Sequence, residues 1–410
     1  MNSRCTFYRR KNYLLACSVS IAVLSCVAAV VPARADGHIS SAGSVAPKPN
    51  NDSWTWANTA MIANGAGTTG EVDMSGGATA GGDSLQIGNG DGATGKLQID
   101  GNNSHLSTTG TLSVGNDGAS VGTLSITGGA RVDANSRNTA VSIGHEKKST
   151  GHVFVDGSGS TLASNAAITI AYQGKGDLTI ANGGHVSGTK LKLADQPSAT
   201  GVVTISGTGS SWSGTDGVFV GVKGSGELNL FDGGAINDRS LQIAYHPGAS
   251  GTVNIGGGQN DAAKAAGVVN VDVIQFNGLG GGSNGVLNFN TTDGVAINAA
   301  IFGVGTINQI AGTTILNGDT RGFSGDINVS GGQLQYGSGG TGTSQSYNIN
   351  DNSQVSFDYA NSVVFSGQIS GTGEVIQKGT GTTTLSGHNS YSGGTIIENG
   401  VLQVGSDDAL

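Results

Sequence analysis

Residues 151–255 decide the fold, because one short pattern returns in them at a fixed spacing. Its occurrences are Gly151-His-Val153-Phe-Val155, Gly176-Asp-Leu178-Thr-Ile180, Gly201-Val-Val203-Thr-Ile205, Gly226-Glu-Leu228-Asn-Leu230 and Gly251-Thr-Val253-Asn-Ile255. The opening glycines recur with a constant 25-residue period. Polar and apolar residues alternate in each pattern, which is typical of a strand with one buried face. A fixed period of this length indicates a solenoid, in which each repeat forms one turn.

Each repeat also contains a second apolar strand whose position varies. These strands begin at Ile168, Leu191, Val218 and Leu241, so their distance from the opening glycine alternates between 17 and 15 positions. The loops compensate for this difference, as expected if every strand must lie above its equivalent in the previous coil. One coil alone buries too little apolar surface to offset its chain entropy. We therefore predict an all-β fold, a right-handed parallel β-helix (solenoid) of roughly 13 coils.

Residues 1–35 have the composition of a signal peptide. The segment begins with a basic region, continues with an apolar run to Val31, and ends in Ala33-Arg34-Ala35, which fits the small-residue cleavage pattern. We predict cleavage after Ala35; a retained membrane anchor and lipidation at Cys26 are the alternatives. All three cysteines lie in this segment, so the mature chain has no disulfide.

The mature chain is predicted to have three parts. Residues 36–69 are a polar lead-in and an N-terminal cap, in which Trp54 and Trp56 either pack or form a sugar-stacking site. Residues 70–285 form a β-helix with coils of about 25 residues, in which paired glycines supply positive φ at the corners. Trp212 matches leucines of other coils, so we expect it in the core. Residues 286–410 continue the β-helix with two copies of a 68-residue repeat, each long enough for about three coils.

The 25-residue period breaks after Gly251. Residues 256–284 are rich in Gly, Ala and Asn, and only Asp261, Lys264 and Asp272 are charged among them. We expect residues 261–267 to form a loop or one short helix. Since an enzymatic coil would gather carboxylates in its longest loop, this composition favours a binding or structural protein over an enzyme.

The C-terminal sequence resembles a known family. The stretch Gly379-Thr-Gly-Thr-Thr-Thr-Leu385-Ser-Gly387-His-Asn-Ser-Tyr391-Ser-Gly393-Gly-Thr395, with Gly400-Val-Leu402, is similar to the passenger-associated transport repeat of bacterial autotransporters. This resemblance, centred on residues 371–405, implies a β-helical passenger that reaches the surface of Gram-negative bacteria through an outer-membrane β-barrel translocator. Many such passengers are adhesins, and some carry a protease or esterase domain.

The resemblance also sets expectations about partners and location. No barrel follows the transport repeat, so we expect the translocator to be absent from this chain and the chain alone to stay periplasmic. In the complete protein the passenger would lie at the cell surface or outside the cell. A host-surface protein or a glycan is the candidate ligand. Without residues 1–35 the chain carries 14 basic against 28 acidic residues, which makes a nucleic-acid partner a poor fit.

No motif predicts a catalytic, cofactor or metal site, so we expect no enzyme and no cofactor. Gly82-Asp83-Ser84-Leu85 reads as an esterase nucleophile block, but Leu85 matches the first apolar residue of a repeat strand and no Asp-x-x-His follows. The turn at Asp91 is not repeated as a calcium-binding array requires, and we attribute the Asp407-Asp408 pair to solvation. The alternative is a β-helical enzyme acting on esters or polysaccharides.

Overall fold

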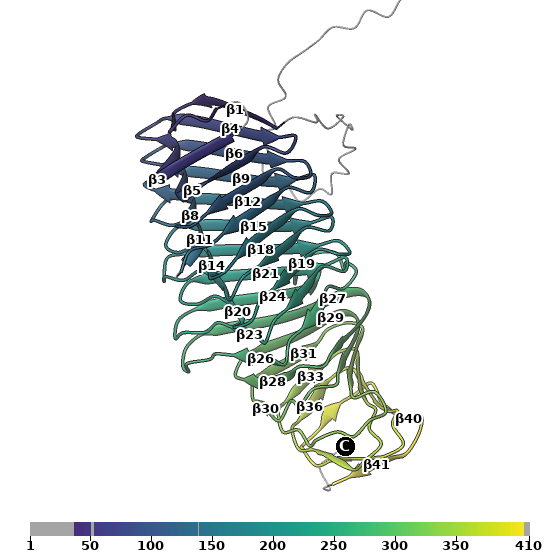
Figure 1. Ribbon diagram of the computed structural model, residues 1–410. Helices are drawn as coiled ribbons and strands as arrows, with labels where there is room; N and C mark the ends of the chain where they lie inside the picture. The colour runs from purple at the N-terminus through teal and green to yellow at the C-terminus, as the bar shows by residue number, and fades with distance from the viewer. Residues whose placement is uncertain (1–36, 51–52, 138, 406–410) are drawn as a thin grey trace, which may run out of the picture. The chain divides into compact units, whose positions relative to one another are not determined.

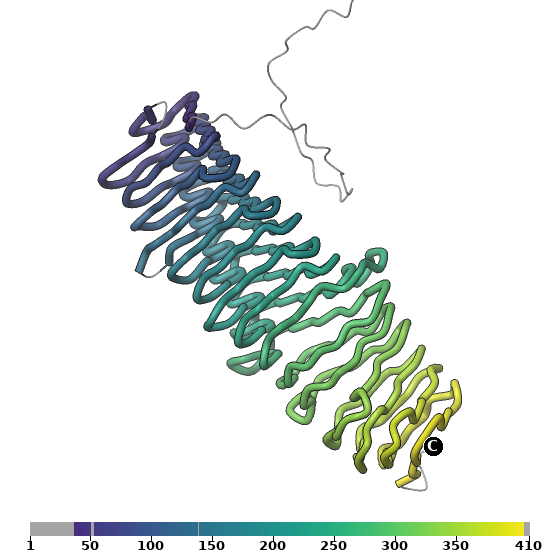
Figure 2. The backbone as a smooth tube through the Cα atoms, turned by 45° about the vertical axis from the view of Figure 1, so that its right-hand side comes forward, coloured from purple at the N-terminus to yellow at the C-terminus, as the bar shows by residue number. Residues whose placement is uncertain are grey.

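The chain folds into stacked coils of β-strand, seen in a computed structural model that describes residues 37–50, 53–137 and 139–405. Within these ranges the regular elements are strands, with no helix. They form two sheets of 19 strands and one of three, in which successive coils pair in parallel (Figure 1). Figure 2 shows the coils following one another along one axis. The predicted all-β solenoid is confirmed; the coil number and the hand of the coils stay predictions.

The opening patterns form one face of the solenoid. Their glycines lie side by side in register, in the order Gly70, Gly95, Gly122, Gly151, Gly176, Gly201, Gly226, Gly251 and Gly285. The strands are β4 (Thr69–Ser75), β6 (Thr94–Asp100), β9 (Val121–Thr127), β12 (Thr150–Asp156), β15 (Lys175–Ala181), β18 (Thr200–Ser206), β21 (Ser225–Phe231), β24 (Ser250–Gly256) and β27 (Asn284–Ile297). The register expected from the 25-residue period is thus confirmed.

The second predicted strand is also present, in parallel register from coil to coil. Ile168 lies beside Leu191, which lies beside Val218, which lies beside Leu241. These strands are β8 (Leu112–Asp117), β11 (Thr139–Ile143), β14 (Ala167–Ile170), β17 (Leu191–Leu193), β20 (Val218–Val220), β23 (Ser240–Ile243), β26 (Val273–Phe276) and β28 (Ala300–Gly303).

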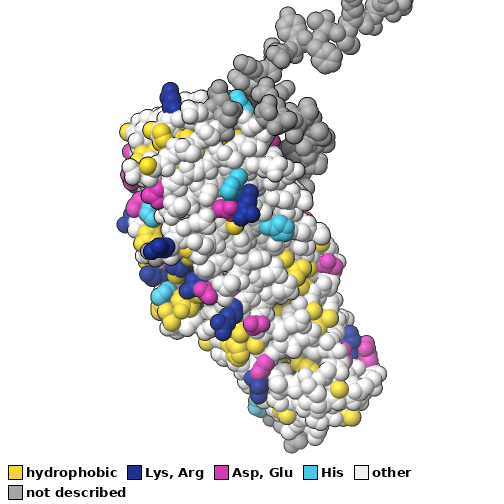
Figure 3. All heavy atoms as spheres, in the orientation of Figure 1, with side chains coloured by type: hydrophobic (Ala, Val, Ile, Leu, Met, Phe, Trp, Pro, Cys, Tyr) yellow, Lys and Arg dark blue, Asp and Glu magenta, His cyan; other side chains and the backbone are white. Residues whose placement is uncertain are grey.

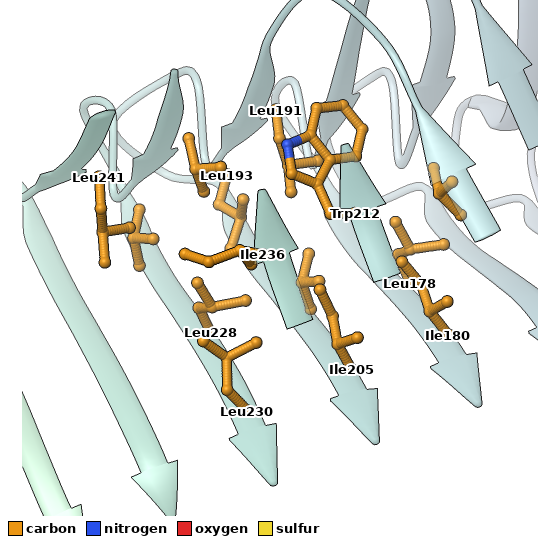
Figure 4. Packing of buried hydrophobic residues seen from close by; sticks show 14 of the residues in the cluster. Leu178, Ile180, Leu191, Leu193, Ile205, Trp212, Leu228, Leu230, Ile236 and Leu241 are labelled. Carbon is orange, nitrogen blue, oxygen red and sulfur yellow. The ribbon is translucent and has the colours of Figure 1, made fainter. Parts of the chain in front are cut away.

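Each coil has a third, short strand that the sequence did not predict. Its inward residues form one column, Leu106, Val132, Leu162, Val186, Trp212, Ile236 and Val269. The strands are β7 (His105–Thr108), β10 (Arg131–Ala134), β13 (Thr161–Ser164), β16 (His185–Ser187), β19 (Ser211–Ser213), β22 (Ala235–Asn237) and β25 (Val268–Asn270). Trp212 is fully buried, as predicted; Figure 4 shows it among aliphatic side chains from successive coils.

The coil corners need positive φ, and glycine supplies much of it. The paired glycines Gly76-Gly77 and Gly128-Gly129 all have φ between 62° and 87°, which confirms their predicted role. Gly184 and Gly234 do not share it, because the residues before each pair, Asn182 and Asp232, take positive φ instead. Asparagine and aspartate tolerate this conformation better than most residues.

The N-terminal coil is closed by an antiparallel strand. β1 (His38–Gly43) pairs antiparallel with β4, and β2 (Val45–Ala46) pairs antiparallel with β3 (Ser53–Asn64), which then pairs in parallel with β5 (Thr79–Asn89). Trp54 is 1% exposed, and its indole Nε1 donates to the Pro47 carbonyl at 2.9 Å. Trp56 is also buried. Since a sugar must reach the ring face, this burial is incompatible with the sugar-stacking alternative.

The coils shorten after β27. There Leu334, Val355, Val375 and Thr395 lie in register, at intervals of 20 or 21 positions. The strands are β29 (Thr306–Leu316), β30 (Gly322–Phe323), β31 (Asp326–Val329), β32 (Gln333–Tyr336), β33 (Ile349–Asp351), β34 (Gln354–Phe357), β35 (Val363–Phe365), β36 (Ile369–Gly371), β37 (Glu374–Gln377), β38 (Thr382–Leu385), β39 (Ser390–Tyr391), β40 (Thr395–Ile397) and β41 (Val401–Val404). Their core is aromatic, with Tyr336 stacked on Phe357 at 5.5 Å between ring centroids.

The two copies of the 68-residue repeat do not lie above one another. Leu334 of the first copy belongs to β32, whereas its counterpart Leu402 belongs to β41, which pairs with β38 on another face. The intervals between paired positions fit the predicted length of about three coils in each copy. Because the shorter coils advance by 20 or 21 positions, a 68-residue copy completes three of them and part of a fourth. The second copy is therefore rotated relative to the first.

Candidate binding groove

The irregular segment after β24 is a loop that docks on the outside of the solenoid. Residues 257–266, called the insert below, form a loop, which resolves the choice between a loop and a short helix. The Gly257 amide donates to the Asn290 carbonyl at 2.8 Å. The Asn290 side chain returns two hydrogen bonds, from Nδ2 to the carbonyls of Gly258 (2.8 Å) and Asp261 (2.9 Å). This amide therefore fixes the first half of the insert to β27.

The second half of the insert is held from both sides. The Asp232 and Gly233 amides donate to the Ala265 and Ala266 carbonyls, each at 2.9 Å. The Ala266 amide donates to Asp293 Oδ1 at 2.8 Å, and the Lys264 ammonium lies 3.8 Å from the centroid of the Phe231 ring. Because both halves of the insert are held by these contacts, its exposed tip residues, Gln259 and Asn260, keep a fixed position on the solenoid.

A ladder of asparagine side chains runs beside the insert on the outer face of the sheet. Asn254 Nδ2 donates to Asn229 Oδ1 at 2.8 Å, Asn288 to Asn254 at 2.7 Å, Asn308 to Asn288 at 2.8 Å and Asn328 to Asn308 at 3.0 Å. The side chains come from β21, β24, β27, β29 and β31, one from each coil. Asn254 and Asn288 are buried on this outer face, whereas Asn328 is partly exposed.

The groove lies where this ladder emerges beyond the tip of the insert. It is open to solvent and has a volume of about 290 Å³. Its lining residues are Gln259, Asn260, Asn308, Ile310, Asn328, Val329, Ser330, Asn350 and Asn352. Six of these nine have a side-chain amide and, of the described residues that line the groove, none is charged. The groove can therefore donate and accept hydrogen bonds without selecting a charged ligand.

A carboxyl group lies in the interior beside the groove wall. Asp351 stands between Asn350 and Asn352 and is fully buried. Burial raises the pKa of this carboxyl to about 6, and the nearby Glu374 adds to the rise, while the Ser353 amide that donates to Asp351 Oδ1 at 2.9 Å opposes it. Asp351 Oδ2 has no hydrogen-bond partner among the described residues. This group affects the stability of the wall, because its charged form is costly there.

Ser84 occupies a structural position in the β5 strand. Its hydroxyl accepts a hydrogen bond from the Thr111 amide of the next coil at 3.2 Å. Leu85 is fully buried, in register with Leu112. Leu85 is thus a core residue of a repeat strand, as predicted, but the tetrapeptide lies inside β5 and is not a loop that leads into it.

A serine–histidine contact that the sequence reading missed lies in the β11 coil. Ser142 Oγ is 2.9 Å from His145 Nδ1, and His145 Nε2 is 3.8 Å from Glu146 Oε1. The His145 ring stacks on Tyr172 with 5.1 Å between centroids. Ser142 is only 1% exposed. A nucleophile must reach a substrate carbonyl, so this burial favours a structural role for the contact.

The remaining sequence candidates are not brought together. Asp91 Oδ1 accepts from the Ala119 amide at 3.0 Å, which fixes a turn between two coils. Within the described ranges, His, Asp and Glu side chains form no group of three that could hold a metal ion. The predicted signal segment, its cleavage residue Ala35 and the Asp407-Asp408 pair lie outside the described residues.

A recurring asparagine in the sequence marks the floor of the groove, but the sequence-based prediction did not use it. An asparagine stands between two core-facing residues in Val253-Asn-Ile255, Leu287-Asn-Phe289, Ile307-Asn-Gln309, Ile327-Asn-Val329 and Ile349-Asn-Asp351. In register, this outward position becomes a continuous column. The interval along the column changes from 34 to 20 to 22 positions, so no fixed period revealed it.

On the face shown in Figure 3, basic and acidic side chains lie near one another rather than in separate patches. Arg321 and Asp319 form an ion pair at 2.8 Å, in which hydrogen bonds from the guanidinium lower the pKa of the Asp319 carboxyl to about 2. In the described part of the chain, no helix is long and apolar enough to cross a membrane.

Comparison with known proteins finds a family match in the C-terminal coils. The model of the passenger-associated transport repeat matches residues 311–335 and 375–404. The chain is 47% identical over 53 residues to the adhesin BmaC autotransporter of Brucella suis biovar 1 (strain 1330). That match covers 13% of this chain and 2% of the adhesin. No solved structure matches the chain significantly.

These findings agree on a class of protein. A solenoid of stacked parallel strands is an elongated scaffold with a repetitive surface. The two transport-repeat matches and the similarity to an autotransporter adhesin support the interpretation of this chain as an autotransporter passenger domain.

Proposed function

We propose that this chain is the passenger region of an autotransporter and acts as an adhesin-like binding scaffold. Residues 1–35 direct export and are removed after Ala35. An outer-membrane translocator then carries residues 36–410 to the cell surface. In this proposal residues 36–69 form the lead-in and cap, residues 70–285 the longer coils, and residues 286–410 the shorter coils with the transport repeat at 371–405.

The observation that carries this proposal is the presence of transport repeats in coils that continue directly into the solenoid. Such a body can hold a surface away from the membrane, because each coil rests on its neighbours. The similarity to an adhesin favours binding as its purpose. The groove between the insert and the asparagine ladder is the described feature best suited to hold a ligand, since it is concave and lined with polar groups of fixed orientation.

The proposal includes no catalysis. The hydroxyls of Ser84 and Ser142 are both engaged within the solenoid, and Ser142 is buried. A hydrolytic passenger is the competing function, and the Ser142–His145 contact is the observation in its favour. Turnover of a short-chain ester by the purified mature chain, abolished by Ser142→Ala, would establish that alternative.

Surface display and adherence test the proposed function. The full chain is fused after Leu410 to an autotransporter translocator and expressed in a non-adherent Gram-negative host. We expect protease-accessible passenger on intact cells, an N-terminus at Asp36, and binding to host cells or matrix above that of the translocator alone. Display at the surface without binding to any cell type or matrix would contradict the adhesin-like function.

A further inference from the structure

We propose that the groove binds a neutral glycan chain, which lies along the asparagine column and across the strands. This inference rests on the proposed function as a binding passenger and names the ligand class for its groove. Two independent features lead to it: the amide ladder that forms the floor and the anchored insert that forms one wall.

The chemistry of the lining matches hydroxyl groups. A side-chain amide offers two N–H donors and one carbonyl acceptor, so it can accept from one sugar hydroxyl and donate to the next. Asn328 is oriented in advance, because its Nδ2 already donates to Asn308 at 3.0 Å. In the next coil Asn350 Oδ1 accepts from Asn352 Nδ2 at 3.3 Å. These contacts reduce the entropy lost when a ligand orders the side chains.

The spacing of the groups matches a chain-like ligand. The floor amides come from successive coils, Asn308 from β29, Asn328 from β31 and Asn350 from β33. Stacked strands lie about 4.8 Å apart, a repeat comparable to the length of one sugar residue in an extended chain. Each successive coil would thus contact the equivalent hydroxyl groups of each successive sugar residue. The insert tip, with Gln259 and Asn260, adds further amides from the side.

Other ligand classes fit this lining less well. Acidic glycans and nucleic acids need basic groups, and none lines the described groove. Protein partners are usually anchored by aromatic side chains or arginine in a desolvated pocket. Here the apolar lining is limited to Ile310 and Val329. For a neutral, hydroxyl-rich chain, the groove already contains the hydrogen-bond donors and acceptors that recognition requires.

The test uses purified mature chain, residues 36–410, and a panel of immobilised oligosaccharides. The panel contains neutral chains of glucose, mannose, galactose and N-acetylglucosamine, together with sialylated and sulfated versions. We expect binding to at least one neutral class that changes little with salt. Asn350→Trp, which fills the groove from an exposed position, and the double change Gln259→Ala with Asn260→Ala should each weaken it at least about tenfold.

Asn317→Ala is the matched control. Asn317 is an exposed asparagine that donates to Asn298 at 3.0 Å and does not line the groove, so its removal should leave binding unchanged. Circular dichroism and the unfolding midpoint show whether each variant folds. If Asn350→Trp does not fold, the double change at the exposed tip still tests the groove.

Three results would overturn the glycan proposal, and the first two concern neutral chains. One is the absence of binding to every neutral chain, and the other is binding that the groove variants leave intact. Binding only to sulfated or sialylated chains, lost as salt rises, would likewise contradict a neutral ligand. If displayed cells still adhere and the groove variants abolish that adherence, the binding function stands and only the ligand class is wrong. Cells that do not adhere at all would contradict the proposed function itself.

Discussion

The opening glycines set the period of the chain for a steric reason. Built onto Gly151, a Cβ would overlap the Val114 carbonyl oxygen, and at Gly251 it would overlap the Val220 carbonyl oxygen. In both places the backbone of an earlier strand passes directly against the glycine. Because each coil repeats this approach, each coil repeats the glycine, and the repeat becomes visible in the sequence.

Replacing Gly151 with alanine should therefore lower stability through overlap rather than through backbone strain. We expect a cost of about 3 kcal/mol, at the upper end for an overpacked interior, measured as a lower midpoint in urea. Gly248 is the control: it has a φ of 78° and open space around it, so alanine there meets only the strain of a left-handed conformation, about 1 kcal/mol. Equal costs at the two positions would contradict the steric explanation.

Asp351 should make stability depend on pH. Its pKa of about 6 in the folded chain exceeds the ordinary value of 3.8, so the folded state binds the proton more tightly than the unfolded state. The wild type should then lose stability as pH rises from about 4 through about 6. Asp351→Asn should be the more stable protein at neutral pH, by up to roughly 3 kcal/mol, and equal to wild type near pH 4. Parallel unfolding profiles from pH 4 to 8 would contradict this.

At the scale of the element, the ladder should stabilise the outer face only as a continuous column. Asn288 both donates to Asn254 and accepts from Asn308, so Asn288→Leu leaves a buried acceptor and a buried donor without partners. We expect a loss of about 1–3 kcal/mol. Asn317→Leu, in an exposed pair of asparagines, should change stability by less than about 0.5 kcal/mol. Chemical unfolding monitored by circular dichroism measures the free energy of unfolding of both variants. An unchanged value for Asn288→Leu would show that the ladder does not stabilise the fold.

The elements that were predicted from the sequence share one property: each has at least two inward apolar residues, two positions apart, as in β17 and β20. The opening strands span seven residues in β12 and β15 and alternate throughout, so they were found with their register. The third strand is only three residues long in β16, β19 and β22, with one inward side chain each. A single apolar residue between turns has no period, so Trp212 was recognised as core while its strand was not.

The groove could not be predicted in the same way, because its parts meet only after the coils are stacked. Asn254 and Asn288 stand 34 positions apart, and their contact depends on how much of the intervening chain leaves the coil as the insert. The composition of residues 256–284 indicated an irregular, weakly charged segment, but the structure is irregular mainly in the insert, because β25 and β26 return to the register of the neighbouring coils. Asn290 and Asp293 fix the position of the insert on the solenoid. No local sequence pattern predicts this role for either residue.

Across the whole solenoid, the groove lies where the coil changes size. Gly251 pairs with Gly285, 34 positions later, whereas Leu287 pairs with Ile307, only 20 positions later. The insert accounts for the length of the first of these coils, and the shorter coils that follow carry the transport repeats. The uncharged groove, for which we propose a binding role, thus lies at the junction of the two kinds of coil.

The most direct test of this account is the adherence of bacteria that display the chain with and without an open groove. Cells carrying Asn350→Trp should lose most of the adherence seen with wild type, by about tenfold or more. Cells carrying Asn317→Ala should adhere as wild type, with equal amounts of passenger at the surface in every strain. Equal adherence of the Asn350→Trp and wild-type cells would show that binding, if present, resides elsewhere on the solenoid, and would contradict the central claim.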